Sequence, residues 1–135
     1  MLRDEVRNEV VAWFERAHRD LRAAAVDMGA QPPLSGDAAF HCQQAAEKAV
    51  KGLLVARGIP FPKTHDIRAV ADLVETEDPD LDALLDRASE LTEYAWRFRY
   101  PGDVFDPADD EIADAMAVAA EVVEVLEARA LAPVS

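Results

Sequence analysis

Apolar residues recur every three or four positions along five segments of the chain, which is the spacing of one face of an α-helix. The first segment runs from about Arg3 to Met28. Gly29 can supply a left-handed cap at its end, and Pro32 and Pro33 then forbid continuation. We therefore expect a long first helix followed by a short turn. Its apolar face comprises Val6, Val10, Trp13, Phe14, Ala17, Leu21, Ala24, Ala25 and Met28.

The second segment carries an alanine-rich apolar stripe, and Ser35 or Asp37 can cap its start. Gly58 ends it, and the prolines that follow predict an extended connector. Successive residues turn by about 100° around a helix, so several polar side chains share the side opposite the stripe. Among them Glu47 precedes Lys51 by four residues, a favourable spacing for an ion pair. The polar side comprises His41, Gln44, Glu47, Lys48 and Lys51.

One short and two long segments follow. Thr64 is a good N-cap for a short third helix, and a fourth helix covers about residues 81–95 before Pro101. Asp106 as N-cap and Pro107 at the first position predict the start of the last helix. No alternating strand pattern occurs. The sequence predicts an all-α fold, an up-and-down four-helix bundle with one short additional helix.

Composition fits one globular domain over residues 1–135, with 50% hydrophobic and 30% charged residues. The net charge of −13 is uneven, because residues 1–57 carry eight acids and eight bases while residues 58–135 carry nineteen acids against six bases. Such a field repels nucleic acid and anionic membranes, since phosphate binding depends on Lys and Arg. Any nucleotide or RNA contact must therefore be local or be completed by a partner.

The cysteine and histidine content limits cross-links and metal sites. Cys42 is the single cysteine, and there are three scattered histidines. We expect no disulfide, no metal and no cofactor, with Cys42 a small buried core residue rather than a nucleophile. Apolar runs fall short of the roughly 20 residues that cross a bilayer. The charged N-terminal segment is unlike a signal peptide, so we expect a soluble cytoplasmic protein without membrane contact.

Three short motifs lie in order on this helical pattern. They are Q-Q-A-x-E-K-x-x-K (Gln43, Gln44, Ala45, Glu47, Lys48, Lys51), K-T-H-D (Lys63, Thr64, His65, Asp66) and R-Y-P (Arg99, Tyr100, Pro101). Over roughly residues 10–130 the chain resembles the HEPN domain family, the helical partners of minimal nucleotidyltransferases in prokaryotes, and it looks like the R-Y-P subgroup. The resemblance implies a homodimer, a separate small nucleotidyltransferase as partner and a toxin–antitoxin setting.

The chain departs from the catalytic members of that family. HEPN ribonucleases carry an Arg-x(4–6)-His motif, in which arginine and histidine from two subunits meet to cleave RNA. Here no arginine is followed by histidine at that spacing, and the positions that follow Arg99 at that distance hold Val104, Phe105 and Asp106. Such cleavage needs an imidazole for proton transfer and a cation on the phosphate. We therefore assign no catalytic residue.

Two lysines and a histidine are candidates for nucleotide binding. Lys48 and Lys51 lie about one turn apart and could hold a phosphate, or they could line a solvated face with Glu47. His65 could contact a base edge or a phosphate, or be an exposed histidine beside the Thr64 cap.

Arg97, Arg99 and Tyr100 are the other candidates, because they combine cations and aromatic rings in an acidic half of the chain. Arginine suits bidentate phosphate recognition and tyrosine can stack on a base. In the alternative, Trp96 and Tyr100 cap the core while the arginines neutralise neighbouring acids.

These observations support two hypotheses about function, a binding subunit and an enzyme. The preferred one is a non-catalytic subunit that pairs with itself and with a separate nucleotidyltransferase to form or regulate a nucleotide site. The alternative is a HEPN ribonuclease with a rearranged site that uses Arg99, or Arg97, and His65. Self-association also has support in the pattern, since Val118 and Val125 widen the apolar stripe of the last helix to about half its circumference.

Overall fold

A computed structural model describes residues 2–99, 101 and 106–132. This part of the chain contains helices and loops but no strand, which confirms the predicted all-α fold. None of its helices is both long and apolar enough to span a bilayer. The elements are α1 (Asp4–Gly29), α2 (Ser35–Ala56), α3 (Ile67–Ala71), α4 (Pro79–Ser89), the 3₁₀ helix η1 (Thr92–Ala95) and α5 (Asp109–Ala130).

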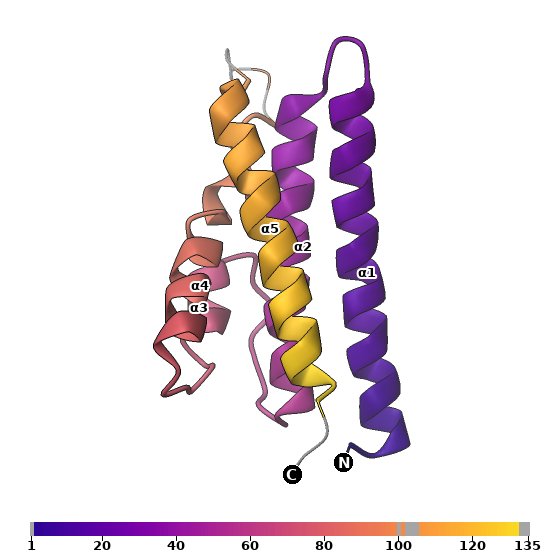
Figure 1. Ribbon diagram of the computed structural model, residues 1–135, viewed down its shortest axis with the longest axis vertical. Coiled ribbons are helices and arrows are strands. Elements are labelled where there is room, and N and C mark those ends of the chain that lie inside the picture. Colours follow the sequence, from indigo (N-terminus) through magenta and orange to yellow (C-terminus); the bar gives the residue numbers. More distant parts are fainter. Residues whose placement is uncertain (1, 100, 102–105, 133–135) are drawn as a thin grey trace.

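Helix α2 is the centre of the bundle. It packs against α1, α3, α4, η1 and α5. Figure 1 shows α1 antiparallel to α2, with α5 beside them and the short α3 and α4 on the side away from α1. The fourth predicted helix is divided in two, because α4 ends at Ser89 and the chain tightens into η1.

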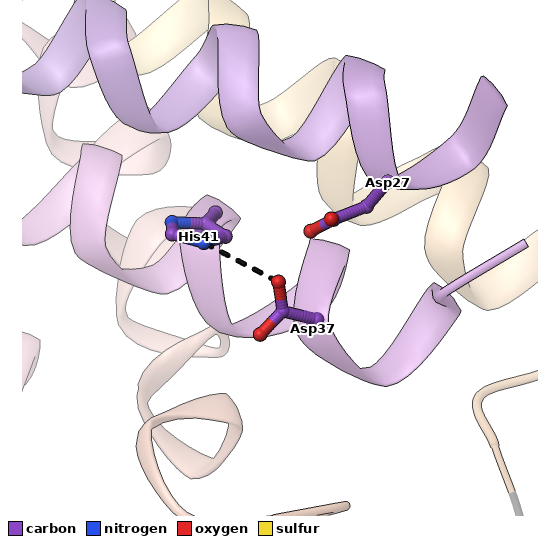
Figure 2. A group of neighbouring side chains, drawn as sticks. All are labelled: Asp27, Asp37 and His41. Atoms are coloured by element: carbon purple, nitrogen blue, oxygen red, sulfur yellow. Dashed lines mark ion pairs between the residues drawn. The ribbon is translucent and has the colours of Figure 1, made fainter. Parts of the chain in front are cut away.

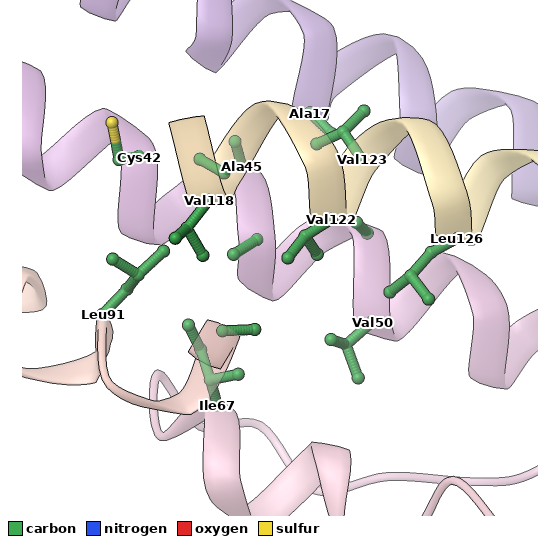
Figure 3. Packing of buried hydrophobic residues seen from close by; sticks show 14 of the residues in the cluster. Ala17, Cys42, Ala45, Val50, Ile67, Leu91, Val118, Val122, Val123 and Leu126 are labelled. Carbon is green, nitrogen blue, oxygen red and sulfur yellow. The ribbon is translucent and has the colours of Figure 1, made fainter. Parts of the chain in front are cut away.

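The predicted apolar stripes form one continuous core. Figure 3 shows α2, α5 and the residues after α4 contributing to it, with Val50, Val122 and Leu126 among the buried side chains. Phe14 of α1 packs directly over Gly52 of α2. A Cβ on Gly52 would lie 2.7 Å from the Phe14 ring, so only glycine lets these helices approach as closely as they do.

The wide apolar stripe of α5 is largely covered within the chain. Val118 is buried and Val125 is half-buried, because α5 packs against α1, α2 and α4. The width of this stripe is therefore explained by three neighbouring helices. It does not by itself require a second copy of the chain.

Three predicted helix ends are wrong. Helix α1 is followed by Ala30 in an extended conformation at φ −70°, so no left-handed glycine caps it. Helix α3 is capped by Asp66, whose carboxylate accepts the Arg68 N–H at 3.0 Å, and not by Thr64. Helix α5 begins only after Ala108. Local preference marks a helix end only to within a few residues, since the tertiary contacts of the flanking loop decide among the candidates.

Of the alternatives for the polar side of α2, a solvated face does not hold for Glu47 and Lys51. Glu47 is 3% exposed and Lys51 is 7% exposed, and Gln43 beside them is fully buried. The helical wheel places polar residues opposite the apolar stripe but does not reveal how many elements surround the helix. Here α1 and the connector after α2 cover that face.

We predict that Leu53→Ala lowers the free energy of unfolding by about 2–5 kcal/mol, because it leaves a cavity in the closed core. Leu53 is fully buried on α2, whereas Leu34 is 54% exposed. Urea unfolding of both variants is the measurement, and Leu34→Ala should stay within about 0.5 kcal/mol of the parent. Equal losses in the two variants would contradict this placement of the core.

Candidate functional site

The carboxylate of Glu47 is the hub of a buried polar network, which we call the Glu47 network. Its Oε1 accepts the amide N–H of Gln43 at 3.0 Å and lies 2.9 Å from Nδ1 of His65. Its Oε2 accepts a hydrogen bond from the Lys51 ammonium at 3.0 Å. The spacing of four residues places Gln43, Glu47 and Lys51 on one helix face. The two motifs that the sequence separates thus meet at one carboxylate.

The same network fixes the connector between α2 and α3, residues 57–66. Lys51 Nζ donates to the carbonyl of Thr64 at 2.9 Å, and Gln43 Nε2 donates to the carbonyl of His65 at 2.9 Å. Two successive carbonyls of the connector are therefore hydrogen-bonded to buried side chains of α2. These contacts set the position of the Lys63–His65 segment relative to the bundle.

A cleft of about 560 Å³ opens beside this network, and we call it the aromatic cleft. The rings of Trp13 and Phe61 meet edge to face at 6.1 Å, and Lys51 Nζ lies 5.9 and 5.8 Å from their centroids. These distances suit cation–π attraction, which adds to the hold on the ammonium. The cleft is lined by Trp13, Lys51, Phe61, Lys63, Thr64 and His65.

The aromatic cleft has the chemistry of a small-molecule site. Apolar walls with a few convergent polar groups are typical of ligand clefts of this size. Aromatic side chains can stack on a base, and a lysine or histidine at the rim can bind a phosphate. His65 has a side chain 69% exposed, and Lys63 is exposed. Lys51 is held by Glu47 and Thr64, so Lys63 is the cation that a ligand would meet.

Lys48 belongs to a neighbouring ion-pair cluster. Its ammonium donates to the buried carboxylate of Asp20 on α1, whose other oxygen lies 2.9 Å from Nδ1 of His41. Lys48 also lines a smaller cleft of about 290 Å³ that shares Trp13 with the aromatic cleft. Its charge is thus paired between α1 and α2, in contrast to the free phosphate-binding lysine considered above.

Arg97 is paired with acidic neighbours. Its guanidinium donates to Glu93 and to Glu111 at 3.1 Å each. Tyr94 donates its hydroxyl to Glu111 at 2.7 Å, and burial together with this hydrogen bond raises the pKa of the phenol.

Arg99 stacks on an aromatic ring near the start of α2. Its guanidinium carbon is 3.8 Å from the centroid of Phe40, and the nitrogen Nη1 is 3.5 Å from Asp37. Tyr100 lies outside the described residues. Phe40 and Lys51 are eleven residues apart, which is about 17 Å along the helix axis. The structure therefore brings Lys51 and His65 together and leaves the arginines near the other end of α2.

Cys42 is fully buried in the core, as predicted. Burial raises the pKa of its thiol to about 12. Because the thiolate is the reactive form, this side chain is not a nucleophile near neutral pH.

Sequence reasoning missed Trp13, Phe61 and Asp20 as site residues, and it noted Lys63 only within a motif. Trp13 fits the apolar pattern of α1, so periodicity assigns it to the core. One signal could have singled out the connector, since Phe61 and Lys63 flank Pro62 in an otherwise extended segment. Proline there stiffens the chain that carries both side chains.

Comparisons with known proteins agree with this architecture. The sequence model of the family described as HEPN domain matches residues 10–129. A crystal structure of an archaeal HEPN homologue is similar with a TM-score of 0.66 and 27% sequence identity, over 90% of this chain and 97% of that chain. No curated protein matches the chain.

We predict that Glu47→Ala lowers the free energy of unfolding by about 3–5 kcal/mol, because it leaves Lys51 buried without its counter-charge. Glu121→Ala is the matched control. Its carboxylate pairs with Arg87 at 3.1 and 3.2 Å, but both side chains are about half exposed. Chemical denaturation should show a loss below about 1 kcal/mol for this control. A similarly small loss for Glu47→Ala would mean that the buried network adds little stability.

Proposed function

The chain belongs to the HEPN domain family, and from this premise we propose that it is a self-associating helical subunit that pairs with a separate nucleotidyltransferase and binds a nucleotide in the aromatic cleft. The observation that carries the proposal is the aromatic cleft itself. It joins the two family-like motifs of α2 and the connector at one opening, with Trp13 and Phe61 as apolar walls. The proposal includes the toxin–antitoxin setting that the resemblance implies.

A nucleotide suits the cleft on three grounds. The two rings offer apolar faces for a base. Lys63 and His65 offer donors for a phosphate at the rim. The cleft also provides the local cationic contact that an acidic chain of net charge −13 requires, because the exposed Lys63 lines it.

The small number of exposed donors in the cleft supports a partner protein. Lys63 and His65 are the only exposed donors among the side chains that line it. A nucleoside triphosphate carries more negative charge than one lysine neutralises, so our proposal expects further cations from another chain. Pairing with a nucleotidyltransferase would supply them, and self-association would present two such clefts.

One observation favours a second function, the ribonuclease. His65 and Glu47 form a histidine–carboxylate pair at 2.9 Å that borders the cleft. A carboxylate that orients an imidazole is a common arrangement for a general base. Within one chain Lys63, rather than Arg97 or Arg99, would then face the RNA phosphate. Cleavage of RNA by the pure protein in EDTA, abolished by His65→Ala, would establish this function in place of the first.

We predict that Lys63→Ala weakens nucleotide binding roughly ten- to a hundredfold, the value of one charge-assisted contact. The measurement is calorimetric titration of the full chain with ATP, alone and with any nucleotidyltransferase partner. Arg22→Ala removes an exposed cation from α1 and is the control that should leave affinity unchanged. Loss of affinity in Arg99→Ala, with Lys63→Ala unaffected, would move the site to the arginine segment.

We predict that the tagged chain sediments as a dimer at micromolar concentration and retains a small nucleotidyltransferase when the two are produced together. The family resemblance is the reason for both expectations. A 14.8 kDa monomer with no retained partner would contradict both self-association and pairing. The ATP titration would still test nucleotide binding in the cleft separately.

A further inference from the structure

Three potential metal ligands converge where α1 ends and α2 begins. Asp27 comes from the last turn of α1, and Asp37 and His41 come from the first turns of α2. One ligand atom from each lies within 4.8 Å of the other two, and we call this group the Asp27 cluster. Figure 2 shows the Asp27 carboxylate reaching across from α1 toward the other two side chains.

His41 presents the right nitrogen to this cluster. Its Nδ1 lies 2.9 Å from Asp20 Oδ1, while the second Asp20 oxygen accepts the Lys48 ammonium. A carboxylate accepts hydrogen bonds, so the contact with Asp20 places an imidazole proton on Nδ1. The other nitrogen, Nε2, lies 3.4 Å from Asp37 Oδ2, and either a second proton or a metal ion would bridge these two atoms.

Asp27 has an oxygen that is not satisfied. Its Oδ2 is buried and has no hydrogen-bond partner. Buried polar atoms nearly always have one, so a proton or a cation is expected at this atom. Asp27 and Asp37 also bring two negative charges close together, which a cation between them would stabilise.

The nearby cations contact other oxygen atoms of these carboxylates and of Asp20. Arg99 lies 3.5 Å from Asp37 Oδ1, which is the oxygen other than the one facing His41. Lys48 is held by Asp20 on the far side of the imidazole. Both cations thus occupy outer oxygens, and the inner ligand atoms of the Asp27 cluster face one another.

We propose that Asp27, Asp37 and His41 bind one first-row divalent metal ion of the zinc type, with Asp20 as the residue that orients the imidazole. One nitrogen and two carboxylate oxygens are the ligands that such ions accept, with water in the remaining positions. A carboxylate on the second nitrogen is the usual support of a ligating histidine. Ligand atoms bound tetrahedrally to zinc at about 2.0–2.2 Å stand about 3.3–3.6 Å apart, so the side chains would need to close by up to about 1.5 Å.

This site is distinct from the aromatic cleft. His41 and Lys51 are ten residues apart on α2, or about 15 Å along its axis. A bound ion would tie the end of α1 to the start of α2. The scattered histidines and the single cysteine predict no metal, and only the fold brings Asp27 of α1 close to Asp37 and His41 of α2.

The test uses ZnCl2 as the probe and the full chain, stripped with EDTA and desalted. Calorimetric titration should show one saturable site per chain, and zinc should raise the melting temperature. Asp27→Asn and His41→Gln should remove that site. Asp20→Asn should weaken zinc binding about ten- to a hundredfold, the usual effect of losing the partner of a ligating histidine.

His18→Gln is the matched control. His18 also lies 3.0 Å from a carboxylate, that of Glu127, but within the described part of the chain it belongs to no group of three potential metal ligands. Its loss should leave zinc binding unchanged. Circular dichroism of each metal-free variant checks that the helices are intact, and Asp27→Asn keeps the shape of the side chain, so this variant should fold. Absence of a saturable site in the parent, or equal zinc binding by Asp27→Asn, would overturn the proposal.

Discussion

The structure depends on the burial of helix α2 on every side. Elements pack around it from α1 to α5, so even its polar face lies away from water. Taking a carboxylate or an ammonium out of water costs several kcal/mol unless hydrogen bonds and an opposite charge compensate. Glu47 and Lys51 meet that condition through each other, through Gln43 and through the connector. The polar motif of α2 therefore stabilises the fold, whether or not it also contributes to a binding site.

That requirement also shapes the candidate site. The helix does not satisfy its buried groups alone, and two of the hydrogen bonds reach the carbonyls of Thr64 and His65. Because these carbonyls are fixed, the side chains around them are placed as well. Phe61 comes to rest near Trp13, and Lys63 and His65 border the same opening. A cleft thus arises where a loop completes the hydrogen bonding of a buried helix, and this explains why two motifs distant in sequence line one opening.

Much of the fold follows from the sequence, and less of the site does. The three- and four-residue spacing predicts the helices and most of their buried positions, since it reports which face each helix turns inward. It does not report how many neighbours a helix has, so it left open whether Glu47 and Lys51 face water, and both are buried. Motif order indicates the family, but Trp13 reads as an ordinary core position. The sequence did not show which end of α2 Arg97 and Arg99 approach, because the loops between helices decide this and periodicity does not describe loops.

The Glu47 network and the Asp27 cluster differ in whether hydrogen bonds within the chain satisfy their carboxylate oxygens. In the Glu47 network both carboxylate oxygens accept hydrogen bonds, and Lys51 neutralises the charge. In the Asp27 cluster, by contrast, one buried oxygen has no partner, and the nearby cations contact other oxygens. The first arrangement is complete without a ligand, so its exposed edge at His65 and Lys63 is free to face a nucleotide. The second has a buried oxygen without a partner, and we have proposed a divalent ion there because such ions prefer carboxylate oxygens and an imidazole nitrogen as ligands.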